Sequence, residues 1–598
     1  MTPGRIRSFD LSPDGTRMLV TADGSGRPQP WIVPLDGSPP RLIAVHGAVQ
    51  RCVWTPDGAR FIALVDPDGR EDNQVAVVDV ATGAVEPIAA QPWVRAEIGA
   101  PYTTGSSPCS PDGRWLAFAT NRRAVDCFDI VVRDLASGAE RSLLTAGDTV
   151  PVDRYFPVTF SWDSRQLLIT LLHQNTQHDL YAADLGSGEV HLLTPHEGFA
   201  KYFGTAWRPE GIYLCATHDG DFTGVGLLDN AGGMHWIDTP EHDIDCAALS
   251  ADGGTLAWAV NEDGFTTLRA CQIKDGMAGE VVTVTGLPAG SYTRERSFDG
   301  HGLQLSADGG TLFTLDSTDA LWSADRAAGQ ARQLTASVGT AAAPSPEVVR
   351  FASEDGVRVP ALVYRPAGPG PFPVVLHIHG GPEDQAIPVS DPLIDGLLDR
   401  GIAVLATNIR GSSGYGLRYQ RMIYRDWGGG DVTDLRAAAE FLRAQPWADP
   451  DRLGVYGASY GGFASLCCMT RLPEYWRAGV SECGVPDLVE DARTLPPTWR
   501  RRVADWIGDV NDPADRERLR QASPATYADQ IRAPLLLIHG TNDTRVAIGP
   551  TDAFHARLVG LGKTVTYRRI DGAGHQIAQQ QAGFEAMTRD WLAENLLG

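Results

Sequence analysis

A five-residue phrase recurs seven times in the first half of the chain, and this repetition restricts the fold more than any other feature of the sequence. Most copies pair proline or a small residue with an acidic residue and a glycine, which is the chemistry of a tight turn between two strands. Successive copies lie 42 to 56 residues apart. They begin at Leu11 (LSPDG), Trp54 (WTPDG), Cys109 (CSPDG), Phe160 (FSWDS), Trp207 (WRPEG), Leu249 (LSADG) and Leu305 (LSADG).

Each repeat unit has the pattern of four short strands. Alternating runs follow the turn, of which RMLVTA (17–22), QVAVVDV (74–80) and ERSLLT (140–145) are examples. Four strands in roughly 45 residues is the spacing of a propeller blade. We therefore expect residues 1–340 to form an all-β, seven-bladed propeller. The acidic and aromatic residues of the repeats are expected to serve turns and core, without a ligand.

A different pattern begins after the repeats. At 598 residues the chain is longer than one hydrophobic core usually supports, and the segment ASVGTAAAPSPE (336–347) is typical of a linker. Beyond it, apolar strands such as FPVVLHIHG (372–380) alternate with helical runs such as DVTDLRAAAEFLRAQ (431–445). This alternation predicts a mostly parallel, doubly wound sheet with both faces covered, over residues 341–598.

The sequence Gly457-Ala458-Ser459-Tyr460-Gly461 matches the GxSxG pattern of a nucleophile elbow. A bare match would be weak in a chain with 65 glycines. Here the pattern follows the strand LGVYG and precedes a helix that begins near Tyr460, which is the setting the motif requires. The glycines permit a tight turn that lifts the serine hydroxyl above the sheet at a helix N-terminus. We therefore expect an α/β-hydrolase domain with Ser459 as its nucleophile.

A serine nucleophile needs a base, and the base needs an acid that orients it. Asp543 follows the apolar strand APLLLIHG in the loop GTNDTRV, and His575 follows the strand TVTYRRI in the loop DGAGHQ. Their order after the serine, and their position after later strands, are those of an α/β-hydrolase triad. Asp571 is a competing acid, on the same loop as the histidine. His377, His379 and His539 are interpreted as hydrogen-bonded packing residues.

The tetrahedral intermediate of acyl transfer needs two donors for its oxyanion. The amide after the nucleophile, that of Tyr460, is expected to supply one of them. The second is expected from the loop His379-Gly380-Gly381-Pro382, which follows the strand VVLHI, because glycine lets the backbone approach the substrate oxygen closely. Gly381 is favoured over Gly380 as that donor.

The composition limits which binding partners and which cellular compartment are expected. Lys and Arg number 51 against 74 Asp and Glu, a net charge of -23, and such a field repels nucleic acid and anionic lipid surfaces. The nine cysteines are scattered, with no metal-ligand spacing, and are expected to be reduced thiols of a cytoplasmic protein. Neither a leader nor an 18-residue apolar stretch is evident. We expect no cofactor, no metal, no nucleic-acid partner and no membrane.

The motifs together resemble the prolyl oligopeptidase family over essentially the whole chain. They are the seven SPDG-like repeats, HGGP, NIRGSSGYG, GASYGG, HGTND and GAGH. The acylaminoacyl-peptidase branch is the most similar, because HGGP stands where other branches carry an oxyanion-donating tyrosine. The resemblance implies the triad Ser459, Asp543 and His575, the donors Gly381 and Tyr460, a propeller that restricts access, and a role for Arg545 in binding substrate near the scissile bond. Relatives often associate through exposed strand edges, so a homo-oligomer is among the partners considered.

The function expected is that of a serine peptidase that cleaves short peptides or N-acylated aminoacyl amides through an acyl-enzyme. One alternative is an esterase, amidase or isopeptidase acting on a small metabolite or modified peptide, and another is a propeller-based binding protein with a vestigial hydrolase domain. The chain has no Glu-Glu pair of the kind that dipeptidyl-peptidase relatives use to hold a free amine. Residues 483–510, with Trp499 and Trp506 as walls, are expected to line the pocket for the residue before the scissile bond.

Overall fold

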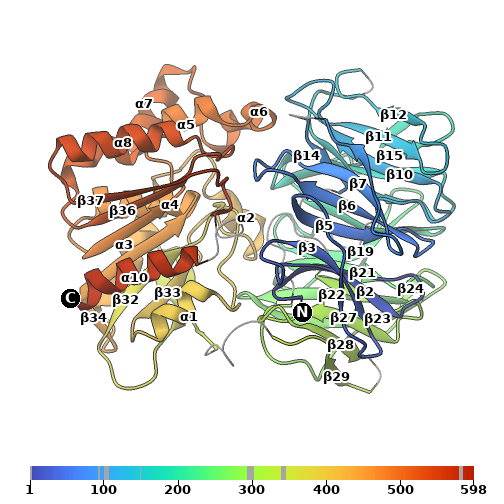
Figure 1. Cartoon of the computed structure of the whole chain (residues 1–598), viewed down its shortest axis with the longest axis horizontal. Helices are drawn as coiled ribbons and strands as arrows, with labels where there is room; N and C mark the ends of the chain where they lie inside the picture. Colours follow the sequence, from blue (N-terminus) through green and yellow to red (C-terminus); the bar gives the residue numbers. More distant parts are fainter. Residues whose placement is uncertain are drawn as a thin grey trace. The chain divides into compact units, whose positions relative to one another are not determined.

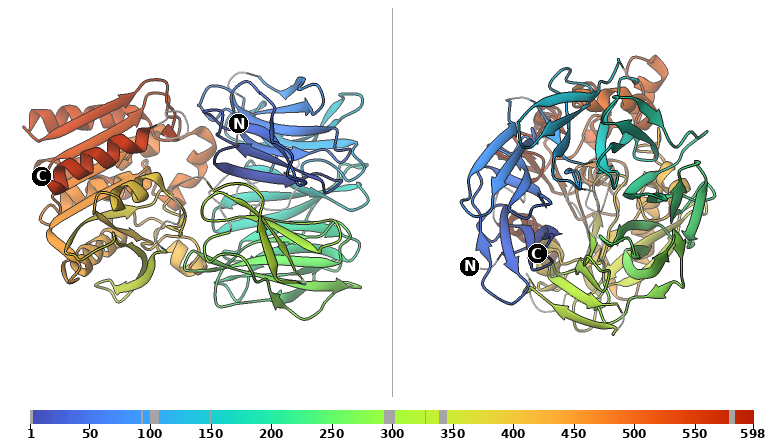
Figure 2. Two further views of the ribbon diagram at one scale, coloured as in Figure 1. Left: turned by 60° about the horizontal axis from the view of Figure 1, so that its bottom comes forward. Right: turned by 90° about the vertical axis from the view of Figure 1, so that its right-hand side faces the viewer.

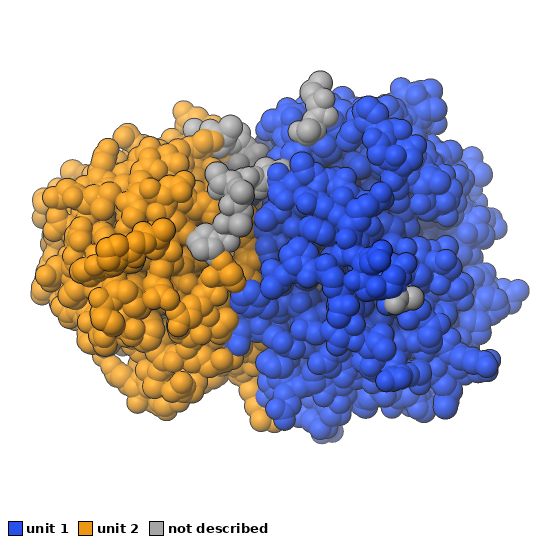
Figure 3. Space-filling model, turned by 90° about the horizontal axis from the view of Figure 1, so that it is seen from below, with its two compact units in different colours: residues 1–338 blue, residues 339–598 orange. Residues whose placement is uncertain are grey.

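The computed structural model describes residues 3–91, 94–99, 107–148, 150–292, 302–326, 328–337, 345–577 and 583–598. The chain divides into two compact units, Met1–Val338 and Gly339–Gly598, which are coloured separately in Figure 3. The boundary expected between residues 340 and 341 falls within 338–344, outside the described residues. Each unit has hydrophobic clusters of its own.

The first unit is a seven-bladed β-propeller, as predicted. Its described strands form seven antiparallel sheets, each built mainly of four consecutive strands, and the sheets are arranged as a ring in the right-hand view of Figure 2. The strands, blade by blade, are β1 (Ile6–Leu11), β2 (Arg17–Ala22), β3 (Gln29–Pro34) and β4 (Arg41–Leu42); β5 (Ala48–Trp54), β6 (Arg60–Asp66), β7 (Gln74–Asp79) and β8 (Val85–Ala89); β9 (Ala96–Glu97), β10 (Trp115–Thr120), β11 (Asp129–Asp134) and β12 (Glu140–Leu144); β13 (Tyr155–Phe160), β14 (Gln166–Gln174), β15 (Gln177–Asp184) and β16 (Val190–Leu192); β17 (Tyr202–Arg208), β18 (Gly211–Thr217), β19 (Thr223–Asp229) and β20 (Met234–Asp238); β21 (Ile244–Leu249), β22 (Thr255–Glu262), β23 (Phe265–Lys274), β24 (Met277–Ala278) and β25 (Val282–Thr283); and β26 (Leu303–Leu305), β27 (Thr311–Leu315), β28 (Leu321–Asp325) and β29 (Gln330–Gln333).

The repeated phrase forms the turn that leads into the second strand of each blade. In the first copy the Ser12 hydroxyl donates to Asp14 Oδ1 at 2.5 Å, while the Asp14 carboxylate also accepts from the Thr16 amide at 3.0 Å. Gly15 closes the turn with φ +69°. These bonds lie entirely within the turn, which is why the sequence alone was sufficient to predict it.

The ring closes through side chains, because each blade is made from one continuous stretch of chain. Gln304, in the last blade, donates to Asp10 Oδ1 at 2.7 Å and accepts from the Leu11 amide at 2.8 Å. Beside this contact Phe313 packs in the same hydrophobic cluster as Ile6. First and last blades are thereby joined across about half of the chain.

The second unit is built on an eight-stranded sheet in the order β30-β31-β33-β32-β34-β35-β36-β37. The first two pairings in that order are antiparallel and the others are parallel. This arrangement confirms the α/β-hydrolase prediction. The strands are β30 (Glu347–Ala352), β31 (Arg358–Tyr364), β32 (Phe372–Ile378), β33 (Ala403–Thr407), β34 (Ala448–Ala458), β35 (Ala478–Glu482), β36 (Leu535–Gly540) and β37 (Val565–Ile570).

Helices cover both faces of this sheet (Figure 1). The pair α1 and α10 packs together on one face, and α3, α4, η1 and α8 pack on the other. None of the helices in the described part of the chain is long and apolar enough to cross a bilayer. The helices are α1 (Pro392–Leu398), α2 (Gly416–Arg421), α3 (Gly430–Arg443), α4 (Tyr460–Arg471), α5 (Leu488–Thr494), α6 (Pro497–Trp506), α7 (Pro513–Ala522), η1 (Pro524–Gln530), α8 (Ile548–Gly560) and α10 (Phe584–Leu597).

Candidate active site

Ser459 stands on a sharp turn between β34 and α4. Its backbone has φ +58° and ψ -121°, a conformation that costs free energy for a residue with a side chain and persists only where the surroundings enforce it. A Cβ on Gly457 would collide with the backbone of Gly461, and one on Gly461 would collide with the carbonyl of Ile378. The two glycines of the motif are therefore required by close backbone packing, and the serine is held at the carboxyl edge of the sheet.

The Tyr460 amide is available at the first turn of α4, where amides have no intrahelical acceptor. The phenol is engaged elsewhere, because it donates to Asp431 Oδ2 at 2.7 Å and its ring packs edge-on against Trp427 at 4.7 Å between centroids. Burial is the largest influence on Asp431 and raises its pKa to about 6, in spite of that hydrogen bond. The Tyr460 side chain thus anchors the helix, and the backbone amide of Tyr460 is the group to which the predicted role of oxyanion donor applies.

Asp543 and His575 are in direct contact. His575 Nδ1 lies 2.7 Å from Asp543 Oδ2, and the Asp543 side chain is fully buried while that of His575 is 6% exposed. Asp543 Oδ1 accepts from the amides of Arg545 and Val546, each at 2.9 Å. Asp571, the competing acid, is exposed. The carboxylate is therefore fixed by the backbone on one oxygen and presents the other to the imidazole.

Backbone contacts between two loops set this geometry. The Asn542 amide donates to the Ala573 carbonyl at 2.8 Å, and the Thr541 amide donates to Ile570 at 3.0 Å. Gly540 is pressed against the Ala573 and Gly574 carbonyls, leaving no room for a side chain. The loop after β36, which carries the acid, and the loop after β37, which carries the histidine, are held as one unit.

The strand that leads to Ser459 is linked to His575 through β35. The Ser459 amide donates to the Glu482 carbonyl at 2.8 Å, and the next residue, Cys483, places its sulfur 4.0 Å from the His575 carbonyl oxygen. All three predicted triad positions thus lie at the carboxyl ends of parallel strands, where α/β folds gather their sites.

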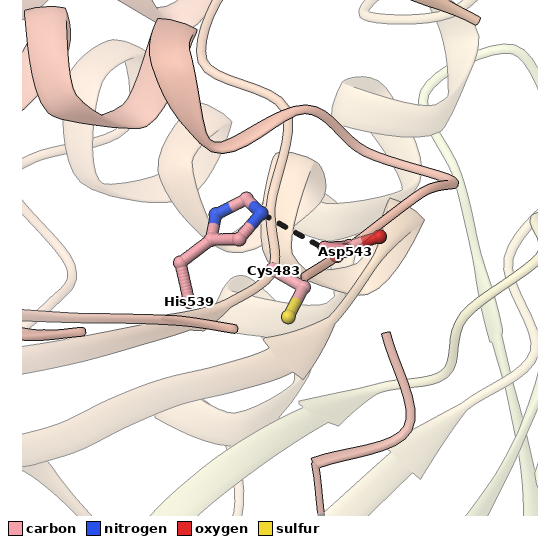
Figure 4. Close-up of side chains that lie close together, drawn as sticks. All are labelled: Cys483, His539 and Asp543. Atoms are coloured by element: carbon pink, nitrogen blue, oxygen red, sulfur yellow. Dashed lines mark ion pairs between the residues drawn. The ribbon is translucent and has the colours of Figure 1, made fainter. Parts of the chain in front are cut away.

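A second histidine contacts Asp543, and the sequence did not reveal this contact. His539 was predicted to be a packing residue, and it is fully buried with Nδ1 3.0 Å from the Thr551 hydroxyl and Nε2 3.0 Å from the Val546 carbonyl. Nε2 also lies 3.4 Å from Asp543 Oδ2, the pair joined by a dashed line in Figure 4. Burial opposes the ionised form of Asp543, but His575 and His539 outweigh it and hold the pKa of Asp543 well below its usual value.

Cys483, His539 and Asp543 bring donor atoms to within 4.8 Å of one another (Figure 4). This donor set is one that zinc uses. Both ring nitrogens of His539 already have hydrogen-bond partners, Asp543 has its own, and burial raises the pKa of the Cys483 thiol well above its usual value. A thiol held neutral is a poor metal ligand, so the three residues are explained by the contacts that hold the Asp543 carboxylate in place.

The predicted oxyanion loop lies beside Ser459. A Cβ on Gly380 would lie 3.7 Å from Ser459 Cβ, an ordinary contact, whereas Gly381 has φ +111° and no room for a Cβ, which would meet the Glu383 amide nitrogen at 2.5 Å. His379 Nδ1 lies 2.7 Å from the Gly380 carbonyl oxygen, and Nε2 lies 2.8 Å from the Ser412 hydroxyl. In a trans peptide the C=O and the following N–H point in opposite directions. Because the Gly380 carbonyl points toward His379 Nδ1, the Gly381 N–H points in the opposite direction, away from that ring nitrogen.

Arg545 is half-buried and lies two residues beyond Asp543 in the loop after β36. Its backbone amide is one of the two that bind Asp543. The residue therefore supports the acid through its backbone, and its guanidinium is a candidate for contact with substrate.

Comparisons with known proteins agree with this architecture. Residues 393–597 match the model of the prolyl oligopeptidase family. Dipeptidyl aminopeptidase BIII of Pseudoxanthomonas mexicana is 25% identical over an alignment 624 positions long, which covers 99% of this chain and 87% of that protein.

Solved structures of similar proteins span nearly the whole chain. A puromycin-hydrolyzing peptidase of Mycobacterium tuberculosis superposes with a TM-score of 0.81 at 20% identity, covering 99% of this chain and 95% of the other. The acylaminoacyl peptidase of Pyrococcus horikoshii gives a TM-score of 0.71, also at 20% identity, covering 99% and 96%. At this level of identity the likeness concerns the fold.

Proposed function

The carboxyl-terminal unit of this chain belongs to the prolyl oligopeptidase family, and from this premise we propose that the protein is a serine peptidase that cleaves short peptides or N-acylated aminoacyl amides. Ser459 is the proposed nucleophile, His575 the base and Asp543 the acid that orients it. The observation that carries the proposal is the contact of 2.7 Å between His575 Nδ1 and the fully buried side chain of Asp543, because it leaves Nε2 of the ring for the serine proton.

The reaction then has two steps. His575 Nε2 takes the proton of the Ser459 hydroxyl as Oγ bonds to the carbonyl carbon, and the oxyanion that forms accepts from the Tyr460 and Gly381 amides. The C–N bond breaks when His575 returns that proton to the leaving amine, which yields the acyl-enzyme. Water attacks the ester with His575 as base, and collapse releases the acid and regenerates the hydroxyl. Asp543 stays ionised and stabilises the imidazolium.

The proposal is tested with p-nitroanilides of single amino acids, N-acetylated and free, together with the matched p-nitrophenyl esters. Release of nitroaniline from acetylated substrates, with covalent capture of a fluorophosphonate at Ser459, is the expected result. Turnover of esters without any amide or peptide would instead favour the esterase alternative. A wild-type protein that turns over none of them and takes up no fluorophosphonate would favour the vestigial-domain alternative.

Release of dipeptides from free N-termini is a second candidate, favoured by the aminopeptidase that aligns along nearly the whole chain. Against it stands the absence of a Glu-Glu pair in the sequence. Parallel assays of H-Gly-Leu and acetyl-Gly-Leu p-nitroanilides separate the two, because a dipeptidyl peptidase requires the free amine that an acyl group removes.

We assign to the propeller (residues 1–340) the role of limiting access to the catalytic domain (residues 341–598), so that only short substrates are cleaved. We also place the protein in the cytoplasm. The support for a reducing compartment is that all nine cysteines are free and buried.

The guanidinium of Arg545 is proposed to bind a substrate carbonyl or carboxylate. Assembly of several copies of the chain through exposed strand edges is also retained as a proposal.

A further inference from the structure

The ring of His539 contacts the loop that carries Asp543. The two side chains are fully buried, and Figure 4 shows the imidazole at the end of β36 with one ring nitrogen directed at the Asp543 carboxylate. Buried polar side chains in native structures nearly always have hydrogen-bond partners. The partners of His539 therefore indicate which parts of the site this ring holds in place.

The chemistry of these partners assigns the hydrogen on the ring. His539 Nε2 lies 3.0 Å from the carbonyl oxygen of Val546 and 3.4 Å from Asp543 Oδ2. Carbonyl and carboxylate oxygens only accept hydrogen bonds, so Nε2 carries a hydrogen. In the neutral ring Nδ1 then accepts from the Thr551 hydroxyl, which lies 3.0 Å away. The Nε2–H group thus presents the positive end of its dipole to the carboxylate.

Val546 connects His539 to the carboxylate a second time. The Val546 amide donates to Asp543 Oδ1 at 2.9 Å, and the carbonyl of the same residue accepts from His539 Nε2 at 3.0 Å. The ring therefore contacts Oδ2 directly and acts on Oδ1 through one residue. Because Oδ2 is also the atom that lies 2.7 Å from His575 Nδ1, two imidazoles share one carboxylate oxygen.

Thr551 connects the other side of the ring to the segment after β35. Its buried hydroxyl, near the start of α8, lies 3.0 Å from His539 Nδ1 and 3.5 Å from the carbonyl oxygen of Gly484. A Cβ on Gly462, in the first turn of α4, would lie 2.7 Å from Gly484 Cα. His539 thus connects the loop after β36 to the segment that packs beside the first turn of α4.

Two other ionisable groups that interact with Asp543 do not favour its charge. Burial raises the pKa of Asp491, on α5, to about 7, and Asp543 raises it further. Burial also raises the pKa of the Cys483 thiol well above its usual value. Although burial opposes ionisation of Asp543 itself, His575 and His539 hold its pKa well below the usual value. The charge of this carboxylate therefore depends on the two histidines.

We propose that His539 is a positioning residue that fixes the Asp543 carboxylate and limits how strongly Oδ2 attracts the proton of His575. This inference rests on the proposed peptidase function and adds a residue to the support of its triad. The Nε2–H group stabilises the ionised acid, so the hydrogen on His575 Nδ1 stays on that ring when the imidazolium forms. Without it, the carboxylate would be less well fixed and would bind the imidazolium more tightly.

The test compares His539→Phe, which keeps an aromatic ring without donors, with His539→Gln, whose amide can donate where Nε2 does. Kinetics on an N-acetylated aminoacyl p-nitroanilide are measured against pH and expressed per site labelled by a fluorophosphonate. We expect His539→Phe to lower kcat by about 10- to 100-fold with little change in KM. The acid limb of its kcat/KM profile should move to higher pH by roughly 0.5 to 1 unit. His539→Gln should recover most of both effects.

Further variants separate positioning from a general loss of structure. His539→Phe combined with Asp543→Asn should lose little more than Asp543→Asn alone, because the ring acts through that carboxylate. His555→Phe replaces a half-buried histidine of α8, whose ring packs on Tyr567 at 5.0 Å between centroids, and should leave kcat and the pH profile unchanged. If His539→Phe gives no labelled protein, Thr551→Val, which removes the partner of Nδ1, should show smaller changes in the same directions.

Three outcomes would overturn the inference. They are an unchanged kcat in folded His539→Phe, a lower kcat with an unmoved acid limb, and a loss that multiplies fully with that of Asp543→Asn. A wild-type protein that neither labels nor cleaves any substrate would instead refute the peptidase function. Normal labelling and turnover of the wild type, with no effect of His539→Phe, rejects only the role of His539.

Discussion

His575 Nδ1 and Asp543 Oδ2 lie 2.7 Å apart, and the other oxygen of the same carboxylate accepts from two backbone amides at 2.9 Å. The two backbone amides thus fix the position of the Asp543 carboxylate independently of its contact with the imidazole. This arrangement determines which ring nitrogen carries the proton at rest, and so which nitrogen is left to act as base.

Asp543→Asn tests this arrangement. An amide nitrogen in place of Oδ2 would donate to Nδ1 and favour the wrong tautomer, so we expect kcat to fall by about 10⁴ with a much smaller change in KM. Steady-state kinetics on an acetylated nitroanilide measure both constants. Asp571→Asn is the matched control, because Asp571 is exposed on the histidine's own loop. A large loss in the control with activity kept in Asp543→Asn would assign the acid to Asp571.

The depressed pKa of Asp543 predicts a pH dependence of stability. The folded-state pKa lies below the value of about 3.9 expected in the unfolded chain. The ionised carboxylate therefore stabilises the fold above about pH 4, and that contribution is lost as the pH falls further. We expect the difference in urea-unfolding free energy between wild type and Asp543→Asn to shrink from pH 6 to pH 3. A difference that stays constant over this range would show that the charge does not stabilise the fold.

Alanine substitutions at Gly381 and Gly380 form a matched pair of tests of the predicted oxyanion loop. Gly381→Ala places a Cβ against the Glu383 amide at a residue with φ +111°, so it should move the proposed donor and reduce kcat by roughly 10²- to 10³-fold. Gly380→Ala makes only ordinary contacts, at 3.4 and 3.7 Å, and should cost much less. Thermal unfolding checks that both variants are folded. Equal kcat losses in the two variants would contradict the assignment of Gly381.

Closure of the propeller ring is tested by Gln304→Ala. The variant loses both bonds to the first blade. The half-buried Asp10, whose pKa burial has already raised to about 6, then keeps the Trp54 amide on Oδ2 but loses the Gln304 donor on Oδ1. We expect a loss of about 1 to 3 kcal/mol in unfolding free energy, seen as a lower urea midpoint and faster proteolysis of the first unit. Gln333→Ala, at an exposed position of the same blade, is the control. Equal stability of the two variants would show that the Gln304 contacts do not hold the ring.

Features with local causes could be predicted from the sequence. The blade turns depend on bonds over two residues, such as Ser12 to Asp14, and the elbow at Ser459 depends on glycines two residues away. Asp543 and His575 were predicted as partners because they follow apolar strands in the expected order, and the two side chains are in contact. Physical rules of short range are sufficient in all these cases.

Features that depend on distant residues could not be predicted in this way. Gln304 meets Asp10 from 294 residues away, and His539 was predicted as a packing residue because its distance to Asp543 depends on how the loop folds back.

The central claim is that Ser459 forms the acyl-enzyme, and the direct test is Ser459→Ala measured by intact-protein mass spectrometry after fluorophosphonate treatment, with peptidase assays in parallel. The account predicts one adduct on the wild-type protein, none on the variant, no turnover by the variant, and equal urea midpoints for both. Turnover or a labelled active site in folded Ser459→Ala would contradict it.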